Sequence, residues 1–167
     1  IIDYEPASYS TQYRIFEKNT TLHNVAANIR RLLVFDILWK QKKGFEKFRE
    51  KYLPISICKY TKSSSPQEFS KYYDAVICGS DQIWNVTAKD CDPIFFLPGK
   101  QSYKKIAYAT SVNNATYNED ICNDQLRKNI LDFDYISIRE HSGAEKISCF
   151  LNTDKQVKVQ PDPSLLQ

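Results

Sequence analysis

The stretch "VICGSDQIWN", residues 76–85, decides how the rest of the chain is interpreted. Its first three residues are apolar and two are β-branched, which is typical of a strand covered on both faces in a parallel sheet. The next four residues, 79–82, are small or polar, so the strand ends abruptly. Ligands bind beyond the carboxyl ends of the strands in an open parallel sheet. The change of character therefore predicts that this strand end faces a ligand cleft.

Strand and helix patterns alternate around this stretch. Apolar runs predict strands at residues 74–80, 104–112 and 135–140, and residues 156–166 predict a strand that runs into a proline-rich exit. Helices are expected at two places, residues 118–133 with an apolar stripe of Ile121, Leu126 and Ile130, and residues 141–151 with Ser142 and Glu145 as a capping box. This alternation predicts an α/β fold with a mostly parallel sheet.

The first third of the chain has a different pattern. Residues 1–4 predict a short strand, and residues 19–40 place apolar side chains near one helical face at Leu22, Val25, Ile29, Leu32, Leu33 and Trp39. Gly44 is expected to interrupt the helix. Residues 45–54 then predict a second short helix, which ends at Pro54 and turns three aromatic side chains inward, Phe45, Phe48 and Tyr52.

Composition excludes several classes of protein. The 167 residues are 42% hydrophobic and 26% charged, as expected of one globular domain. The net charge of +3 is too small to indicate nucleic-acid binding. No apolar run is long enough for a transmembrane helix, and no signal peptide is recognised. The five cysteines form no CxxC pair, which argues against a disulfide framework or a zinc site and favours reduced thiols in the cytoplasm.

Polar residues collect at the ends of the predicted strands, and parallel strands would bring them to one edge. The candidate substrate-binding residues are Ser80, Asp81, Gln82, Ser111, Arg139, Ser142 and Gly143. The serines supply hydroxyl donors, and Arg139 supplies a planar guanidinium that matches carboxylate or phosphate. The helix that starts near Ser142 adds free N–H groups. Together they suit a small anion such as a phosphorylated carboxylic acid.

Structural roles for the same residues stay open at this point. Asp81 can cap a following helix, and Arg139 can form a surface ion pair with Glu140, Glu145 or Asp162. Trp84 is expected to pack in the core rather than to stack on a sugar. Neither His23 nor His141 has a nucleophile at a recognisable spacing, so a hydrolase triad is not supported.

Five segments occur in an order and spacing that resemble the polysaccharide pyruvyl transferase family. They are "YDAVICGSDQIWN" (73–85), "FFL" (95–97), "KKIAYATS" (104–111), "FDYISIREHSGAE" (133–145) and "VKVQPDPSLL" (157–166). The resemblance implies that residues 1–167 are the N-terminal, Rossmann-like, three-layer half of a GT-B-like two-domain architecture. The first strand and helix and the C-terminal domain would then lie outside this sequence, and this chain alone is expected to be inactive.

The resemblance also implies an activity. Characterised family members transfer a pyruvyl group from phosphoenolpyruvate to a sugar hydroxyl of a bacterial surface polysaccharide and form a ketal. The implied partners are phosphoenolpyruvate and a glycan or lipid-linked sugar, with no cofactor, no metal and no nucleic acid. Arg139 matches an arginine expected to hold the donor, and residues 80–82 match the cleft motif. Peripheral association of the full-length protein with a membrane is compatible with this interpretation.

Two other functions are weighed beside it. One is a non-catalytic module that binds a nucleotide or sugar phosphate, and the other is half of a glycosyltransferase that uses a nucleotide sugar. The chain departs from the family pattern in "SVNNAT", residues 111–116, where a glycine often follows the serine. The catalytic residues are not identified from the sequence.

Overall fold

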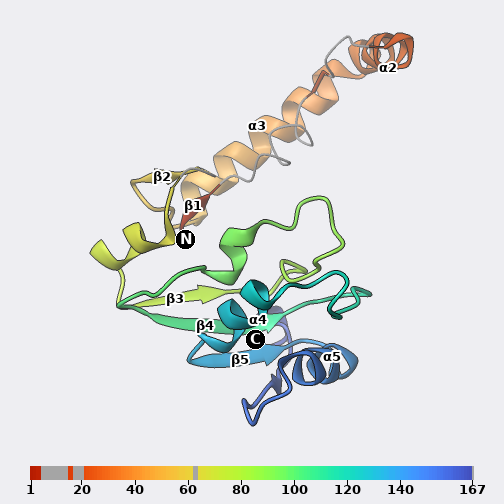
Figure 1. Ribbon diagram of the computed structural model, residues 1–167. Helices are drawn as coiled ribbons and strands as arrows, with labels where there is room; N and C mark the ends of the chain where they lie inside the picture. Colours follow the sequence, from red (N-terminus) through yellow and green to blue (C-terminus); the bar gives the residue numbers. More distant parts are fainter. Residues whose placement is uncertain (5–14, 17–20, 62–63, 167) are drawn as a thin grey trace. The chain divides into compact units, whose positions relative to one another are not determined.

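The computed structural model describes residues 1–4, 15–16, 21–61 and 64–166, apart from the side chain of Leu22. These residues belong to two compact units, Ile1–Ser63 and Ser64–Gln167 (Figure 1). Each unit is described by itself below, as the N-terminal unit and the C-terminal unit.

The C-terminal unit contains a four-stranded parallel sheet. Its strands are β3 (Ala75–Cys78), β4 (Lys104–Thr110), β5 (Tyr135–Ile138) and β6 (Lys158–Val159), in the order β3-β4-β5-β6. Each neighbouring pair is parallel. The prediction of an α/β, Rossmann-like fold with a mostly parallel sheet is confirmed, and all four predicted strand positions contain a strand.

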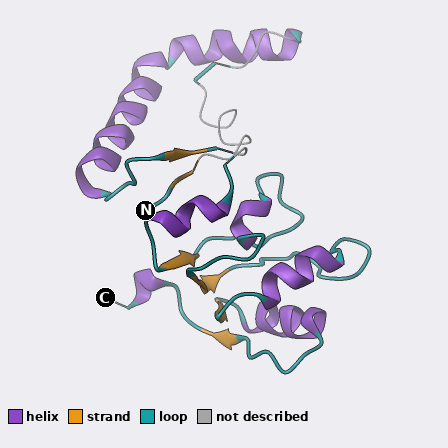
Figure 2. Ribbon diagram, turned by 60° about the vertical axis from the view of Figure 1, so that its left-hand side comes forward, coloured by secondary structure: helices purple, strands orange, loops and turns teal. Residues whose placement is uncertain are grey.

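Helices connect these strands. The α-helices are α4 (Asp124–Leu131) and α5 (His141–Leu151), and the short 3₁₀ helices are η1 (Pro66–Lys71), η2 (Pro93–Phe96) and η3 (Pro163–Leu165). Figure 2 shows α4 and α5 on the same side of the four strands. Helix α5 has the predicted bounds, but α4 begins later than expected because Asn123 caps it. Ile121, expected in the apolar stripe of this helix, precedes it and is exposed.

The sheet is buried on the side that faces these helices. Val76, Ala107 and Ile136 are almost fully buried, whereas Ile77 is 65% exposed. Successive side chains of a strand point to opposite faces, so the alternation separates a covered face from an open one. The expectation that residues 76–78 form a strand covered on both faces is wrong within the described residues, because Ile77, on the second face of β3, is largely exposed.

An aromatic cluster fills the core under the loop that follows β3. The Trp84 ring is fully buried, stacks on Phe96 with centroids 5.4 Å apart, and meets the edge of Phe133 at 5.3 Å. Its indole N–H donates to the carbonyl oxygen of Phe95 at 3.1 Å. This confirms the prediction that Trp84 packs in the core, and it holds the segment after β3 firmly beside the strand ends.

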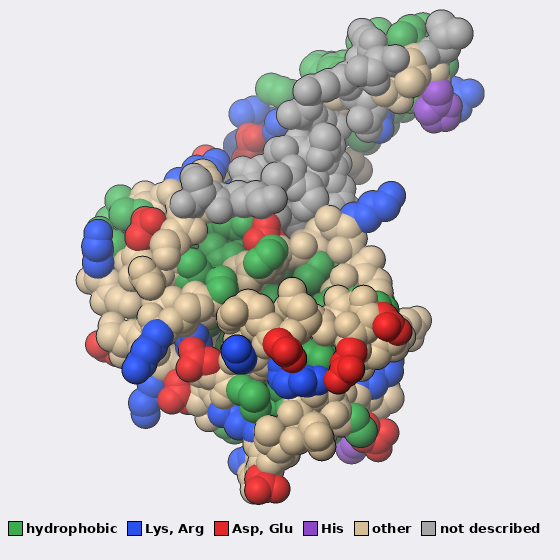
Figure 3. All heavy atoms as spheres, in the orientation of Figure 1, with side chains coloured by type: hydrophobic (Ala, Val, Ile, Leu, Met, Phe, Trp, Pro, Cys, Tyr) green, Lys and Arg blue, Asp and Glu red, His purple; other side chains and the backbone are tan. Residues whose placement is uncertain are grey.

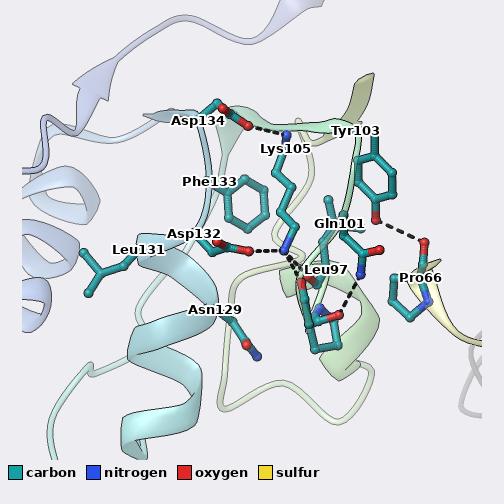
Figure 4. Close-up of polar contacts among 12 residues, drawn as sticks. Pro66, Leu97, Gln101, Tyr103, Lys105, Asn129, Leu131, Asp132, Phe133 and Asp134 are labelled. Carbon is teal, nitrogen blue, oxygen red and sulfur yellow. Dashed lines mark hydrogen bonds and ion pairs between the residues drawn. The ribbon is translucent and has the colours of Figure 1, made fainter. Parts of the chain in front are cut away.

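A buried lysine ties the amino ends of the strands together (Figure 4). Lys105 is 2% exposed, and its ammonium donates to the carbonyl oxygens of Leu97 at 2.8 Å and Gly99 at 2.6 Å and to the carboxylate of Asp132. Its backbone N–H donates to Asp134 at 2.8 Å. A buried charge is tolerated when it is paired and fully hydrogen-bonded. Lys105 therefore joins the loop after η2 to the start of β5.

The N-terminal unit pairs two short parallel strands and carries two helices. Strand β1 (Asp3–Tyr4) lies beside β2 (Lys59–Tyr60). Helix α2 (Leu22–Leu33) is capped by Thr21, and helix α3 (Phe35–Tyr52) follows after one residue. The predicted strand at residues 1–4 is confirmed for residues 3–4, while the expected helical residues 19–20 lie outside the described part of the chain.

Two expectations for these helices are wrong. The helix breaks at Val34, whose φ of −116° and ψ of 17° depart from helical values, and α3 runs through Gly44 without interruption. The aromatic side chains expected to turn inward are instead exposed, Phe45 by 66%, Phe48 by 51% and Tyr52 by 59%. A single glycine weakens a helix without ending it. Gly44 therefore did not predict where the boundary between the two helices lies.

Candidate functional site

The carboxyl ends of all four strands of the C-terminal unit meet at one edge. Backbone hydrogen bonds continue the sheet past the strands: the N–H of Ser111 donates to the carbonyl of Asp81 at 3.1 Å, and the N–H of Arg139 donates to the carbonyl of Thr110 at 3.0 Å. Gln160, just after β6, donates to the carbonyl of Ile138 at 3.1 Å. The predicted polar strand ends are therefore neighbours in space, and we call this group the carboxyl rim.

Asp162 links two of the predicted site residues. Its Oδ2 accepts from the hydroxyl of Ser80 at 2.9 Å and from Nη1 of Arg139 at 3.0 Å. Its other oxygen accepts from the backbone N–H and the hydroxyl of Ser164. The bonds from Ser164, and then those from Ser80 and Arg139, lower the pKa of Asp162 to about 2. The ion-pair alternative for Arg139 is thus confirmed, with Asp162 and Glu140 as its partners.

Glu140 links the third strand end to the same group. The hydroxyl of Ser111 donates to Oε1 of Glu140, which lies 3.5 Å from Nε of Arg139. Ser111 is almost completely buried. The second oxygen, Oε2 of Glu140, is buried and finds no hydrogen-bond partner among the described residues. A buried oxygen of this kind is uncommon in proteins.

Gly79 allows two strand ends to approach closely. Its φ is 134°, a conformation that side chains rarely adopt, and a Cβ at this position would lie 1.9 Å from the carbonyl oxygen of Tyr108. Any larger residue would push β3 away from β4. The glycine is therefore required by the backbone geometry of the carboxyl rim.

Gly143 has a packing role in the first turn of α5. A Cβ there would lie 2.8 Å from Val112, 2.9 Å from Ile138 and 3.2 Å from Glu140. The absence of a side chain lets α5 start directly above the ends of β4 and β5. Gly143 thus places the helix N-terminus at the carboxyl rim, which is a different contribution from direct contact with a ligand.

The remaining predicted residues lie at the outer margin of the rim. Asp81 and Gln82 are exposed, Oδ1 of Asp81 accepts from the N–H of Gln82 at 2.7 Å, and Oε1 of Gln82 accepts from the side chain of Asn113 at 2.9 Å. The suggestion that Asp81 caps the next helix is wrong, because the next helical element is η2 and Asp92 caps it.

The first turn of α5 has no side-chain cap from its N-cap residue. Glu140 is its N-cap residue and makes no side-chain cap hydrogen bond. The expected capping box of Ser142 and Glu145 is wrong, since both residues already lie within the helix and Ser142 is exposed in its first turn. The first N–H groups of a helix have no intrahelical acceptor. They supply a positive dipole end next to Arg139.

The charges of the rim are unequal. Arg139 brings one positive charge, while Asp162 and Glu140 bring two negative charges within 3.5 Å of its guanidinium. Sequence reasoning considered both carboxylates as ion-pair partners and did not include them in the site. The sequence feature that could have placed Asp162 in the site is its position in "PDP", directly after the last strand of the sheet. Extra positive charge is needed before this edge would favour a multiply charged anion.

Searches of the described residues add two negative findings. No helix among them is long and apolar enough to cross a membrane. They contain no group of three or more His, Cys, Asp and Glu side chains that could hold a metal ion.

Comparisons with known proteins identify the family of the chain. No curated protein and no solved structure matches the chain significantly. The family model described as polysaccharide pyruvyl transferase matches residues 3–167, which is nearly the whole sequence. The match includes every strand end of the carboxyl rim. The chain therefore belongs to the polysaccharide pyruvyl transferase family, a family of transferases.

Proposed function

We propose that the chain is the N-terminal half of an enzyme that transfers a pyruvyl group from phosphoenolpyruvate to a sugar of a surface polysaccharide. The main support for this proposal is that Ser80, Ser111 and Arg139 come together at the carboxyl rim, beside the start of α5. The family match supports a transferase. The donor and the ketal product are part of the proposal.

The rim suits part of the chemistry. In pyruvyl ketal formation, the methylene carbon of phosphoenolpyruvate gains a proton, two sugar hydroxyls bond to the neighbouring carbon, and phosphate leaves. Positive character develops at that carbon in the transition state, so nearby carboxylates such as Glu140 would stabilise it. The guanidinium of Arg139 and the N–H groups of α5 would hold the donor's carboxylate or phosphate.

The excess of negative charge sets a condition on this proposal. Asp162 occupies Nη1 of Arg139 and the hydroxyl of Ser80, which are the donors that an anion would use. A bound anion has to share or displace this carboxylate. We infer that basic residues from a second half of the enzyme complete the cleft and offset Glu140 and Asp162. The arrangement of this chain as half of a GT-B-like architecture is part of the same proposal.

The deciding experiment is an assay of the full-length protein with phosphoenolpyruvate and a panel of acceptor glycosides, read by mass spectrometry. The expected result is an acceptor that gains one pyruvyl ketal while phosphate is released. Parallel reactions with nucleotide sugars test the glycosyltransferase alternative, and gain of a hexose there would refute pyruvyl transfer. Binding of a sugar phosphate without turnover of any donor would favour the non-catalytic module.

A binding experiment locates the donor. Phosphoenolpyruvate at millimolar concentration should shift the NMR amide signals of residues 80–82 and 142–144, because those N–H groups border the rim. Signals from residues 89–91, in the loop on the way to η2, serve as the internal comparison. Equal shifts at both places would mean non-specific binding and would count against a donor site at the carboxyl rim.

A further inference from the structure

The helical arm formed by α2 and α3 exposes an unusual amount of apolar surface. Ile29, Leu32 and Leu33 of α2 are 57%, 61% and 84% exposed, and Ile37 of α3 is 59% exposed. Scattered exposed apolar residues are ordinary, but a run of them along two consecutive helices marks an interaction surface. Figure 3 shows hydrophobic side chains next to Lys and Arg side chains along this arm.

Four exposed apolar side chains of α3 share one side of the helix, whereas Phe35 and Trp39 lie on the other side. At 100° per residue, Ile37, Phe45, Phe48 and Tyr52 fall within an arc of about 80°. Lysines border this arc. Lys40 and Lys51 lie next to Ile37 on the helical wheel, and Lys42 lies beyond the opposite margin, which is the pattern of a helix that lies in a membrane interface.

The positive charge of the chain is concentrated on the same arm. Residues 22–52 contain eight Lys and Arg against three Asp and Glu, whereas the rest of the chain contains 15 Lys and Arg against 17 Asp and Glu. The arm thus has a net charge of +5, while the whole chain has +3. A second copy would bring an equally positive arm, and like charges repel. The charge therefore favours an anionic partner over self-association.

Aromatic residues of the arm fit the boundary between water and lipid. Phe48 and Tyr52 of the arc are 51% and 59% exposed, and the ammonium of Lys51 lies over the Tyr52 ring at 5.0 Å. Amphipathic rings and long cationic side chains are enriched at membrane interfaces, where the apolar part is buried and the charge stays in water.

We propose that α2 and α3 dock on an anionic lipid bilayer, with their apolar side chains at the headgroup–acyl boundary and their lysines and arginines at the lipid phosphates. A bilayer accepts a convex helical surface without a matching groove, and these helices are too polar to cross it. The inference does not depend on pyruvyl transfer, because it uses no residue of the carboxyl rim.

Vesicle binding tests the proposal directly. The protein should sediment with vesicles that contain phosphatidylglycerol, bind pure phosphatidylcholine vesicles at least about tenfold more weakly, and lose affinity as salt rises. The chain has two tryptophans; Trp84 is fully buried, and Trp39 lies on the side of α3 opposite the arc. Phe48→Trp places a fluorescent side chain within the arc, and its emission should shift to the blue on vesicle addition by more than that of the unmodified protein.

Matched variants distinguish binding through the arm from a general effect of the protein's positive charge. Phe45→Glu with Phe48→Glu should reduce binding at least about tenfold, as should Lys40→Glu with Lys47→Glu. The same charge change at Lys89 and Lys100, exposed residues of the C-terminal unit, should leave binding within about twofold. Unchanged helical circular dichroism shows that the variants fold.

Three results would overturn the proposal. One is equal binding to neutral and anionic vesicles, and the second is an equal loss in the Lys89 and Lys100 control. The third is absence of vesicle binding together with a dimer in solution that Phe48→Glu dissociates, which would assign the apolar side to a second copy.

Discussion

The amino ends and the carboxyl ends of the strands in the C-terminal unit each carry an ion pair, but the two ion pairs differ in burial and in charge balance. At the amino edge, Lys105 is 2% exposed and its ammonium has one carboxylate and two carbonyl acceptors. At the carboxyl rim, the side chain of Arg139 is 37% exposed and two carboxylates lie within 3.5 Å. The first group is enclosed and balanced, while the second is accessible and has an excess of negative charge.

The difference separates a structural ion pair from a candidate site. Each donor of the Lys105 ammonium is used within the protein, so a ligand has nothing to bind there. At the rim, Glu140 makes no side-chain cap hydrogen bond to the first turn of α5, and its buried Oε2 has no partner among the described residues. Burial of an ion pair is therefore a poor sign of function in this molecule. Incomplete bonding does not separate the two places by itself, because Oε1 of Gln101, beside the Lys105 network (Figure 4), is also buried without a partner among the described residues.

The largest expected effect is on activity, at the rim. Arg139→Ala should lower kcat/KM for phosphoenolpyruvate in the full-length enzyme by about a thousandfold, because the donor loses its guanidinium partner. Stability should change little, since a partly exposed ion pair contributes little. Arg127→Ala is the control, as Arg127 bonds the carbonyl of Phe150 at 2.9 Å and lies away from the rim. Activity close to that of the unmodified enzyme would remove Arg139 from the site.

The next effect is on stability, at the amino edge. Lys105→Met should reduce the free energy of unfolding by about 3 kcal/mol, because Asp132 and two carbonyl oxygens lose their donor. Urea denaturation measures this change. Its neighbour Lys104 is exposed, so Lys104→Met should cost less than about 0.5 kcal/mol. Similar losses for the two variants would contradict the structural role given to Lys105.

The smallest effect concerns the pH dependence of the rim. Asp162 has its pKa lowered from 3.8 to about 2, so its ionised form stabilises the folded state. This contribution is complete above pH 3.8 and is lost as the pH falls through about 2. Asp162→Asn removes the charge, so the variant should unfold at lower urea than the unmodified protein near neutral pH. The two proteins should converge as the pH falls below about 2, and a difference that persists there would refute the assignment.

Much of the fold could be predicted from local patterns. The apolar runs at residues 104–112 and 135–140 each contain a strand, and the helix at 141–151 has its predicted bounds. These segments carry strong periodicity, and their burial follows from it. The open face of β3 could not be predicted in this way, because the exposure of Ile77 depends on whether elements remote in sequence pack against that face.

The location of the candidate site could be predicted from the sequence, but the partners of its residues could not. Parallel strands bring their carboxyl ends to one edge, so the meeting of residues 80, 111 and 139 followed from the alternation of strands and helices. Their partners did not, because Ser80 meets Asp162 across 82 residues of sequence and Arg139 meets it across 23. The roles of Gly79 and Gly143 likewise became clear only from the atoms that a Cβ would meet.

The sequence by itself determined the α/β class, the polar edge of the sheet and the family, because periodicity, strand-end residues and motifs are local properties of the chain. The tertiary structure decided which carboxylates neutralise Arg139, which lysine is buried and which sides of α2 and α3 stay exposed. Those outcomes depend on distances between groups that are remote in sequence. Folding sets these distances, and local propensity carries no information about them.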